Sequence, residues 1–322
     1  MNLNNKMFDK GVKKVSSRDG FGEGLVLAGK DNENVVVLSA DLEESTRIDK
    51  FIKKFPKRFF EVGVAEQNLV TVASGLAAVG KIPFATSYAV FSPGRNWEQI
   101  RTTICYNNVP VKIIGSHTGI SVGADGATHQ ALEDIALMRV LPNMVVISPC
   151  DSIEAKKATQ ALAKINKPCY LRLSRNETPI ITTDKTPFKI GKAEVFREGT
   201  SATIIATGEM VYYSLLAAKQ LEENNISVRV INVHTIKPLD TECVLKAAEE
   251  TRAIVTVEDH QTVGGLGSAI AEVVSQRYPV PIKMIGINDT FGESGTPEQL
   301  MEKYGLTVEN IIKAVTTVIR MK

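Results

Sequence analysis

The sequence predicts an α/β protein with two domains, each a mostly parallel sheet with helices on both faces. Short β-branched and apolar runs alternate with stretches of helical spacing along most of the chain. Parallel strands need crossover connections, which are usually helices, so this long alternation predicts parallel sheets that are covered on both sides. The length of 322 residues also fits two domains of ordinary size.

The first domain is expected at residues 1–180. A helix near 18–30 precedes the run VVVLSA at 35–40, whose β-branched residues are typical of a buried parallel strand. The stretch 66–79 has small and apolar residues at helical spacing, and Gly80 suits the end of a helix. The same alternation predicts a strand at 59–64, an extended segment at 82–91, a helix at 96–106, a strand at 109–116, a glycine-rich loop at 119–128, a helix at 130–139, a strand at 144–149, a helix at 153–164 and a strand at 168–174.

A linker is expected at residues 181–192, followed by the second domain at 193–322. The pattern weakens from residue 176 onward, where polar, proline-containing stretches replace the alternation. The pattern then resumes with a strand at 202–208, a helix through residue 220, a strand at 227–233, a helix at 240–250, a strand at 253–259, a helix at 267–276, a strand at 282–287 and a helix at 308–321.

Composition excludes several classes of protein. No run approaches the roughly 18 apolar residues of a membrane span, and we expect neither a secretory signal nor a membrane partner. The net charge is +2 with acids and bases interspersed, so no nucleic-acid partner is expected. The four cysteines lie far apart and lack metal-ligand spacing, which favours buried thiols in a cytoplasmic protein, and no metal site.

The loop GSHTGISVGADGATHQ is the first candidate site. His117 directly follows the predicted strand at 109–116, and ligands of open α/β sheets bind at the carboxyl ends of strands. Asp125 and His129 lie in the same loop, whose glycines permit close backbone approach. The alternative is a polar surface loop in which the glycines only make turns.

Glu66, Arg18 and Arg175 are further candidates. Glu66 stands among apolar residues at a strand-to-helix junction, where it could share a proton with a ligand nitrogen or simply complement the helix dipole. Arg175 follows the predicted strand at 168–174, and arginine suits bidentate phosphate recognition. Either arginine could instead form an ordinary surface ion pair.

The segment VEDHQTVGGLGSAIAEVV is set aside as a ligand site. It follows a strand and opens a helix, but it lacks the G-x-G-x-x-G spacing of a dinucleotide-binding turn. Tight helix–sheet packing is the favoured explanation of its glycines. We expect His260, which lies beside them, to be structural or part of a subunit contact.

Two segments resemble the transketolase family. GADGATHQALEDIALMRVLPN is similar to the family's G-x-D-G-P-T-H-Q loop with its following helix and L-P-N, with Ala127 in place of the proline. FFEVGVAEQNLVTVASGLAAVG resembles the segment that carries the family's cofactor glutamate, which falls on Glu66. The tail FGESGTPEQLMEKYGLT also matches, so the resemblance covers nearly the whole chain, from a pyrimidine-binding domain to a C-terminal domain.

The resemblance implies thiamine diphosphate as cofactor and transfer of a two-carbon ketol unit between phosphorylated sugars. Glu66 would bond the N1′ atom of the aminopyrimidine and favour its imino tautomer. The other implied roles are contact with the pyrimidine (Phe91, with Tyr88 nearby), contact with the reacting carbonyl and hydroxyl of the donor (His129 and Asp125), contact with the sugar chain and its phosphate (His117), and phosphate binding (Arg18, Ser45 and Arg175). One departure is Gly94, where the family often has a tyrosine three residues after the phenylalanine.

The family's diphosphate and Mg²⁺ motif, G-D-G…N, does not occur in this sequence. The resemblance therefore implies a separate N-terminal subunit that binds both groups, self-association into a dimer, and a heterotetramer with two copies of each chain. Three alternatives stay open: a 1-deoxyxylulose-5-phosphate synthase-like chain, a 2-oxoacid dehydrogenase E1 β-like chain, and an inactive regulatory or scaffold subunit.

Overall fold

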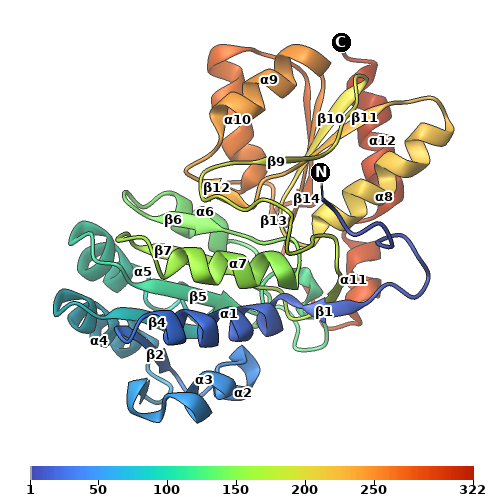
Figure 1. Ribbon diagram of the computed structural model, residues 1–322. Coiled ribbons are helices and arrows are strands. Elements are labelled where there is room, and N and C mark those ends of the chain that lie inside the picture. The colour runs from blue at the N-terminus through green and yellow to red at the C-terminus, as the bar shows by residue number, and fades with distance from the viewer. Residues whose placement is uncertain (1) are drawn as a thin grey trace.

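In the computed structural model, which describes residues 2–322, the first domain is built on the larger of the two main sheets, to which the second domain adds the edge strand β12. Its seven strands have the order β12-β6-β7-β5-β4-β2-β3 (Figure 1). All neighbouring strands are parallel except β12, which runs antiparallel to β6. The strands are β2 (Val35–Ser39), β3 (Phe59–Glu61), β4 (Ile82–Tyr88), β5 (Lys112–Ser116), β6 (Val145–Ile147), β7 (Cys169–Arg172) and β12 (Thr235–Lys237).

Helices cover both faces of this sheet because its strands bury alternate side chains on opposite faces. Val37 packs with Phe21 and Leu25 of α1, whereas Leu38 packs with Leu69 of α4. One face carries α1 (Ser17–Asp31), α3 (Asp49–Lys54) and α7 (Ser152–Leu162). The other carries α4 (Glu66–Ala78), α5 (Trp97–Gln99), the π-helix η2 (Ile100–Tyr106) and α6 (Asp134–Arg139).

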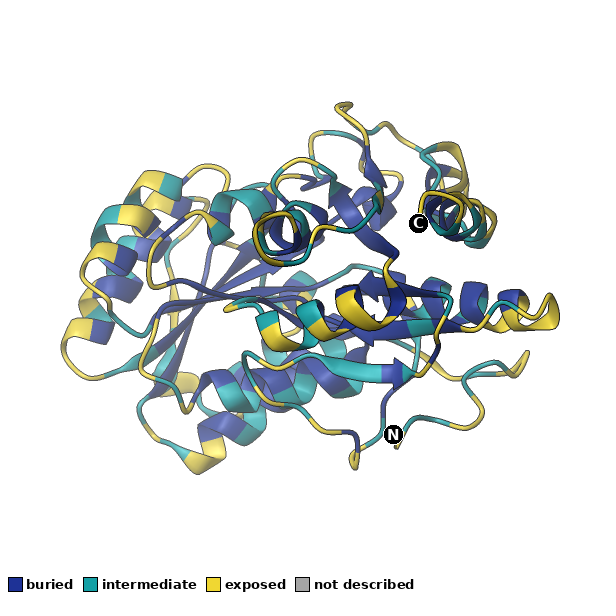
Figure 2. Cartoon of the chain, turned by 90° about the horizontal axis from the view of Figure 1, so that it is seen from above, coloured by how far each residue is buried: buried dark blue, intermediate teal, exposed yellow. Residues whose placement is uncertain are grey.

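The second domain has a five-stranded sheet with the order β14-β13-β10-β11-β9, parallel except for the edge strand β9. Its strands are β9 (Glu194–Arg197), β10 (Ala202–Ala206), β11 (Val228–Asn232), β13 (Ile254–Gln261) and β14 (Ile282–Ile287). Helices α8 (Met210–Glu223) and α12 (Val308–Ile319) cover one face, and α9 (Thr241–Thr251) and α10 (Leu266–Arg277) the other (Figure 1). The predicted fold class is therefore confirmed. Figure 2 shows the buried residues along both sheets and the exposed ones on the outer sides of the helices.

Several elements differ from the sequence-based expectation. The predicted helix at 130–139 begins only at Asp134, because the residues before it contact other segments. Ala131 pairs with Thr118, and the Leu132 carbonyl accepts the amide of Gln261. The segment from residue 176 contains β8 (Glu177–Pro179), which pairs with β1 (Lys14–Ser16). The short helices α2 (Glu43–Thr46), η1 (Pro56–Arg58), η3 (Ile120–Val122) and α11 (Pro297–Lys303) were not expected either.

The two domains share buried side chains, so they pack as one body. One apolar cluster joins Ile113 and Met138 of the first domain to Ile231 and Leu266 of the second. Within residues 2–322, no helix combines the length and the apolar character that crossing a membrane requires. All four cysteines are free thiols.

Glu154 lies fully buried where the domains meet, and its carboxylate makes the stability of the chain pH-dependent. It accepts hydrogen bonds from the Asn232 side chain (2.8 Å) and the Cys150 amide (2.7 Å). Burial, with the neighbouring charge of Asp151, raises the pKa of Glu154 from 4.5 to about 7. The folded chain therefore keeps a proton that the unfolded chain releases above pH 4.5. The free energy of unfolding therefore falls as pH rises from 4.5 towards 7, and the contribution of the retained proton is fully lost above pH 7.

We expect Glu154→Gln to be more stable than the parent chain at pH 8 by on the order of 3 kcal/mol, at about 1.36 kcal/mol per pH unit between the two pKa values. The difference should shrink as pH falls and vanish near pH 4.5. Urea unfolding at both pH values measures it, with the exposed Glu223→Gln as control. An equal difference at both pH values would contradict the assignment to this carboxyl.

Candidate active site

The candidate residues lie at one edge of the larger sheet, where its parallel strands end. Ser45 follows β2, Glu66 follows β3, Tyr88 ends β4, His117 follows β5 and Arg175 follows β7. Neighbouring parallel strands end at the same edge, so residues from distant parts of the sequence come together there.

Arg18 brings the four predicted phosphate-binding residues into contact. Its guanidinium donates to the carbonyl oxygens of Ser45 (2.7 Å) and Arg175 (2.7 Å), and its Nη1 lies 3.5 Å from Nε2 of His117. Burial, with the nearby charge of Arg47, lowers the pKa of Arg18 to about 10, so it stays charged at neutral pH. Arg18, His117 and the Arg175 backbone thus form one group, in which Arg18 carries a buried positive charge.

His117 is held as a neutral ring. A guanidinium can only donate, so Nε2 accepts from Arg18, and Nδ1 carries the proton towards Ser116 Oγ at 2.8 Å. Burial and the charges of Arg18 and Arg175 lower the pKa of His117 to about 3. Its ring stacks on Tyr88 with centroids 3.8 Å apart. His117 can therefore exchange hydrogen bonds with a ligand without changing charge at neutral pH.

The glycine-rich loop places Asp125 and His129 beside this group. Asp125 pairs with the Arg175 side chain at 3.4 Å. The His129 ring meets Phe91 edge-on with centroids 5.5 Å apart, and its Nδ1 lies 2.9 Å from Thr128 Oγ1. The loop residues singled out by sequence thus reach the Arg175 side chain and the Phe91 ring.

Glu66 is the first residue of α4, and only 4% of it is exposed. Both of its carboxylate oxygens lie 3.1 Å from Nη1 of Arg95, whose guanidinium covers the Phe91 ring at 4.0 Å. The departure at Gly94 has a local cause, because a Cβ there would overlap the carbonyl oxygen of Val90. A tyrosine does not fit at this position with this backbone, and Arg95 lies over the Phe91 ring.

The second domain fixes the loop through residues that sequence reasoning missed. The carboxylate of Asp259 accepts from the amides of Ile120 (2.9 Å) and Ser121 (3.4 Å), and Ser121 Oγ donates to Glu209 at 2.6 Å. The only sequence feature that could have identified Asp259 as a site residue is its position at the end of a predicted strand. Nothing in its own segment shows that it reaches a loop 139 residues away.

Asp259→Asn should loosen this loop, because the amide group cannot accept two backbone N–H bonds in the same geometry. We expect hydrogen exchange at Ile120 and Ser121 to become at least about tenfold faster, as loss of about 1.4 kcal/mol of local stability implies. Mass-spectrometric exchange on the peptide containing 117–129 measures it. The exposed Asp289→Asn is the matched control, and equal protection in both variants would show that Asp259 does not hold the loop.

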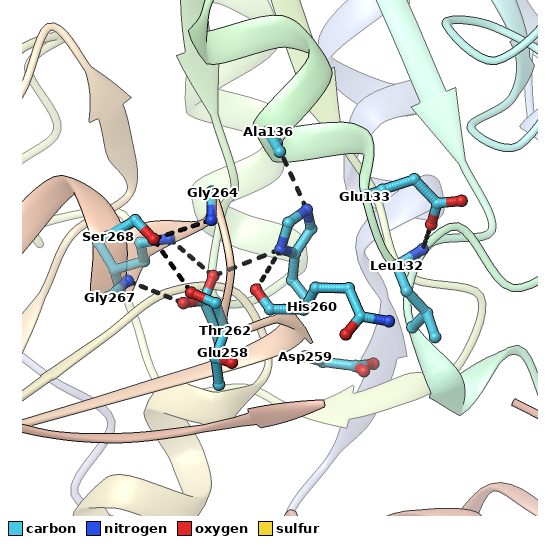
Figure 3. Close-up of polar contacts among 12 residues, drawn as sticks. Leu132, Glu133, Ala136, Glu258, Asp259, His260, Thr262, Gly264, Gly267 and Ser268 are labelled. Carbon is cyan, nitrogen blue, oxygen red and sulfur yellow. Dashed lines mark hydrogen bonds and ion pairs between the residues drawn. The ribbon is translucent and has the colours of Figure 1, made fainter. Parts of the chain in front are cut away.

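Figure 3 shows why the glycine-rich turn at 264–267 is not a free anion site. The Glu258 carboxylate accepts from the amides of Leu266 (2.7 Å) and Gly267 (2.8 Å), so the chain itself satisfies the start of α10. A Cβ at Gly267 would lie 2.7 Å from Thr256 Oγ1, which supports the packing explanation. Buried His260 accepts from the Ala136 amide at 3.4 Å and thereby joins the two domains.

Comparison with known proteins identifies the family. The family models for the transketolase pyrimidine binding domain and the transketolase C-terminal domain match residues 13–180 and 191–311. A putative transketolase C-terminal section from Methanocaldococcus jannaschii is 47% identical, covering 92% of this chain and 94% of that protein. A 6-deoxy-6-sulfo-D-fructose transketolase subunit from Clostridium sp. (strain MSTE9) is 39% identical, covering 99% of each.

A solved structure of a split gene transketolase, an inactive β4 tetramer, matches with a TM-score of 0.90 and 46% identity, covering 96% of this chain and 99% of that one. Sequence, fold and domain order agree over almost the full length. The chain therefore belongs to the transketolase family and comprises a pyrimidine-binding domain followed by a transketolase C-terminal domain.

Proposed function

We propose that this chain is the C-terminal subunit of a two-chain transketolase that moves a two-carbon ketol unit between sugar phosphates with thiamine diphosphate. The observation that carries the proposal is the meeting of Arg18, His117, Arg175, His129 and Glu66 at one sheet edge. A scaffold subunit has no need to gather these residues at the sheet edge where ligands bind. We also propose that residues 181–192 form the linker between the two domains. Because all four cysteines are free thiols, we propose a cytoplasmic location.

The residues present suit the aminopyrimidine half of the cofactor. Glu66 offers a buried carboxylate whose present partner is a planar N–H donor, and Phe91 offers a ring that is already stacked on a planar group. We propose that Glu66 bonds N1′ and that Phe91 and Tyr88 contact the ring. When bound, the cofactor supplies the electron sink for breaking a carbon–carbon bond next to a carbonyl.

Substrate binding is assigned to the positive group around Arg18. Arg18 and Arg175 would bind the phosphate together with Ser45, while neutral His117 would bond the sugar chain. Asp125 and His129 would contact the donor near its reacting carbonyl and hydroxyl. One relative is named for a sulfonated sugar. A sulfonate offers oxygens of similar geometry, so competition between phosphorylated and sulfonated donors measures which sugar the site prefers.

A separate N-terminal subunit is proposed to hold the diphosphate and Mg²⁺. The support is that relatives matching nearly all of this chain are named as a C-terminal section, a subunit and a split gene product. We propose a heterotetramer with two copies of each chain, in which this chain also contacts its own copy.

The test is a ketol-transfer assay with xylulose 5-phosphate, ribose 5-phosphate, thiamine diphosphate and Mg²⁺. It is run on this chain, on the N-terminal chain that carries the G-D-G motif, and on their mixture. We expect transfer only in the mixture. Transfer by this chain alone would overturn the dependence on a partner. A stable complex without transfer would favour the synthase-like or dehydrogenase-like alternative.

Variants at Arg175 and His129 should change different kinetic constants. Arg175→Ala removes a phosphate contact and should raise KM for phosphorylated substrates by about 10-fold or more, with a smaller change in kcat. His129→Ala removes a group beside the reacting atoms and should lower kcat by about 10²-fold or more. Steady-state kinetics of the mixture separate the two. A pure KM effect in both variants would remove His129 from the chemical step.

A further inference from the structure

Arg95 lies between the two groups that the proposed function assigns to the aminopyrimidine. Its guanidinium covers the Phe91 ring at 4.0 Å while its Nη1 contacts both Glu66 oxygens at 3.1 Å. A guanidinium is planar and donates in its own plane, so it can stack on a ring and bond a carboxylate at once. An aminopyrimidine that binds the same two residues needs the same space and the same carboxylate oxygens.

The two side chains of this ion pair differ in how freely they can move. Glu66 is 4% exposed, sits at the start of α4, and its carbonyl is held by the Asn96 side chain at 2.8 Å. The Arg95 side chain is 51% exposed and can turn into solvent. The carboxylate therefore stays in place, and the guanidinium is the group that has to move for another planar donor to enter.

We infer that Arg95 competes with the aminopyrimidine for the site formed by Glu66 and Phe91: it pairs with Glu66 and covers Phe91 until the cofactor displaces it. This inference rests on the proposed function, which assigns Glu66 and Phe91 to the aminopyrimidine. Arg95 is a positioning residue and touches no reacting atom. It keeps the buried carboxylate of Glu66 paired in the isolated chain, at the cost of weaker cofactor binding.

The first measurement uses the isolated chain. Arg95→Met keeps an unbranched, flexible side chain but leaves Glu66 without its charged partner, so we expect the melting temperature to fall by a few degrees. In the double variant Arg95→Met/Glu66→Gln, most of that loss should be absent. Arg101→Met, at an exposed arginine in the nearby η2, is the control and should leave the melting temperature unchanged. A loss that is equal with and without Glu66 would overturn the pairing.

The second measurement is the dissociation constant of thiamine diphosphate, with Mg²⁺, for the mixture with the N-terminal chain, measured by titration calorimetry. Arg95→Met should bind about fivefold more tightly, because the half-exposed ion pair and the cation–π contact no longer compete. Arg101→Met should bind as the parent does. If the parent mixture binds thiamine diphosphate and Arg95→Met binds it equally or more weakly, the competition is overturned while the proposed function stands. No binding by the parent mixture overturns the competition and the proposed function together.

Discussion

Glu66→Gln should lower the kcat of the two-chain enzyme by about 10²- to 10⁴-fold, the range that a positioned proton-transferring group contributes. Glutamine has the same shape but cannot take up or release a proton at the cofactor nitrogen. It therefore keeps the contact while losing the preference for the imino tautomer. The measurement is ketol transfer by the mixture at saturating cofactor, so that any change in affinity does not enter.

The fold of this variant should survive, which makes the result interpretable. The amide oxygen of glutamine can still accept from Arg95, and α4 keeps its buried contacts through Leu69, Val70 and Ala73. Melting temperature and complex formation check this. Glu309→Gln, an exposed residue in the first turn of α12, is the matched control and should keep full activity. A folded Glu66→Gln complex with the parent's turnover would remove Glu66 from the mechanism.

The fold class was predictable because buried parallel strands leave a local signature of β-branched runs at regular spacing. Elements fixed by distant partners were not. β12 pairs with β6, about 90 residues earlier in the chain, and its own three residues carry no periodicity. In the π-helical segment, the hydroxyls of Thr102 and Thr103 bond the carbonyls of Glu98 and Gln99. Such side-chain bonding changes a helix without changing its apolar pattern.

The residues of the candidate site likewise include some that the sequence could predict and some that it could not. Residues that follow strands, such as His117 and Arg175, could be found from topology alone, because the carboxyl edge of a parallel sheet is where ligands bind. Arg95 and Asp259 could not. Arg95 pairs with Glu66, 29 residues earlier in the chain, and Asp259 reaches the loop because the second domain packs against the first. Both are fixed only after folding has joined distant segments.

Arg172→Met should produce the largest loss of stability, about 3–5 kcal/mol, because it leaves a buried carboxylate without its charged partner. Arg172 and Asp134 are buried, with Nε 2.9 Å from Oδ2, and Tyr170 donates to the same oxygen at 2.7 Å. Arg172 also donates to the carbonyl of Asp259 at 2.7 Å, which ties the ion pair to the second domain. Burial opposes the charge of Arg172, but Asp134 more than offsets it, so the pKa of Arg172 is raised.

Urea unfolding of the isolated chain measures this loss, and Arg139→Met is the matched control. Arg139 also links the two domains, but its partner Glu272 is 59% exposed, so its removal should cost less than about 1 kcal/mol. The double variant Arg172→Met/Asp134→Asn should recover a large part of the loss, because a neutral amide can still accept from Tyr170. Equal losses in Arg172→Met and Arg139→Met would mean that water reaches Asp134 at the junction of the domains. If the double variant is no more stable than Arg172→Met, the guanidinium acts through its bond to Asp259 rather than through the charge of Asp134.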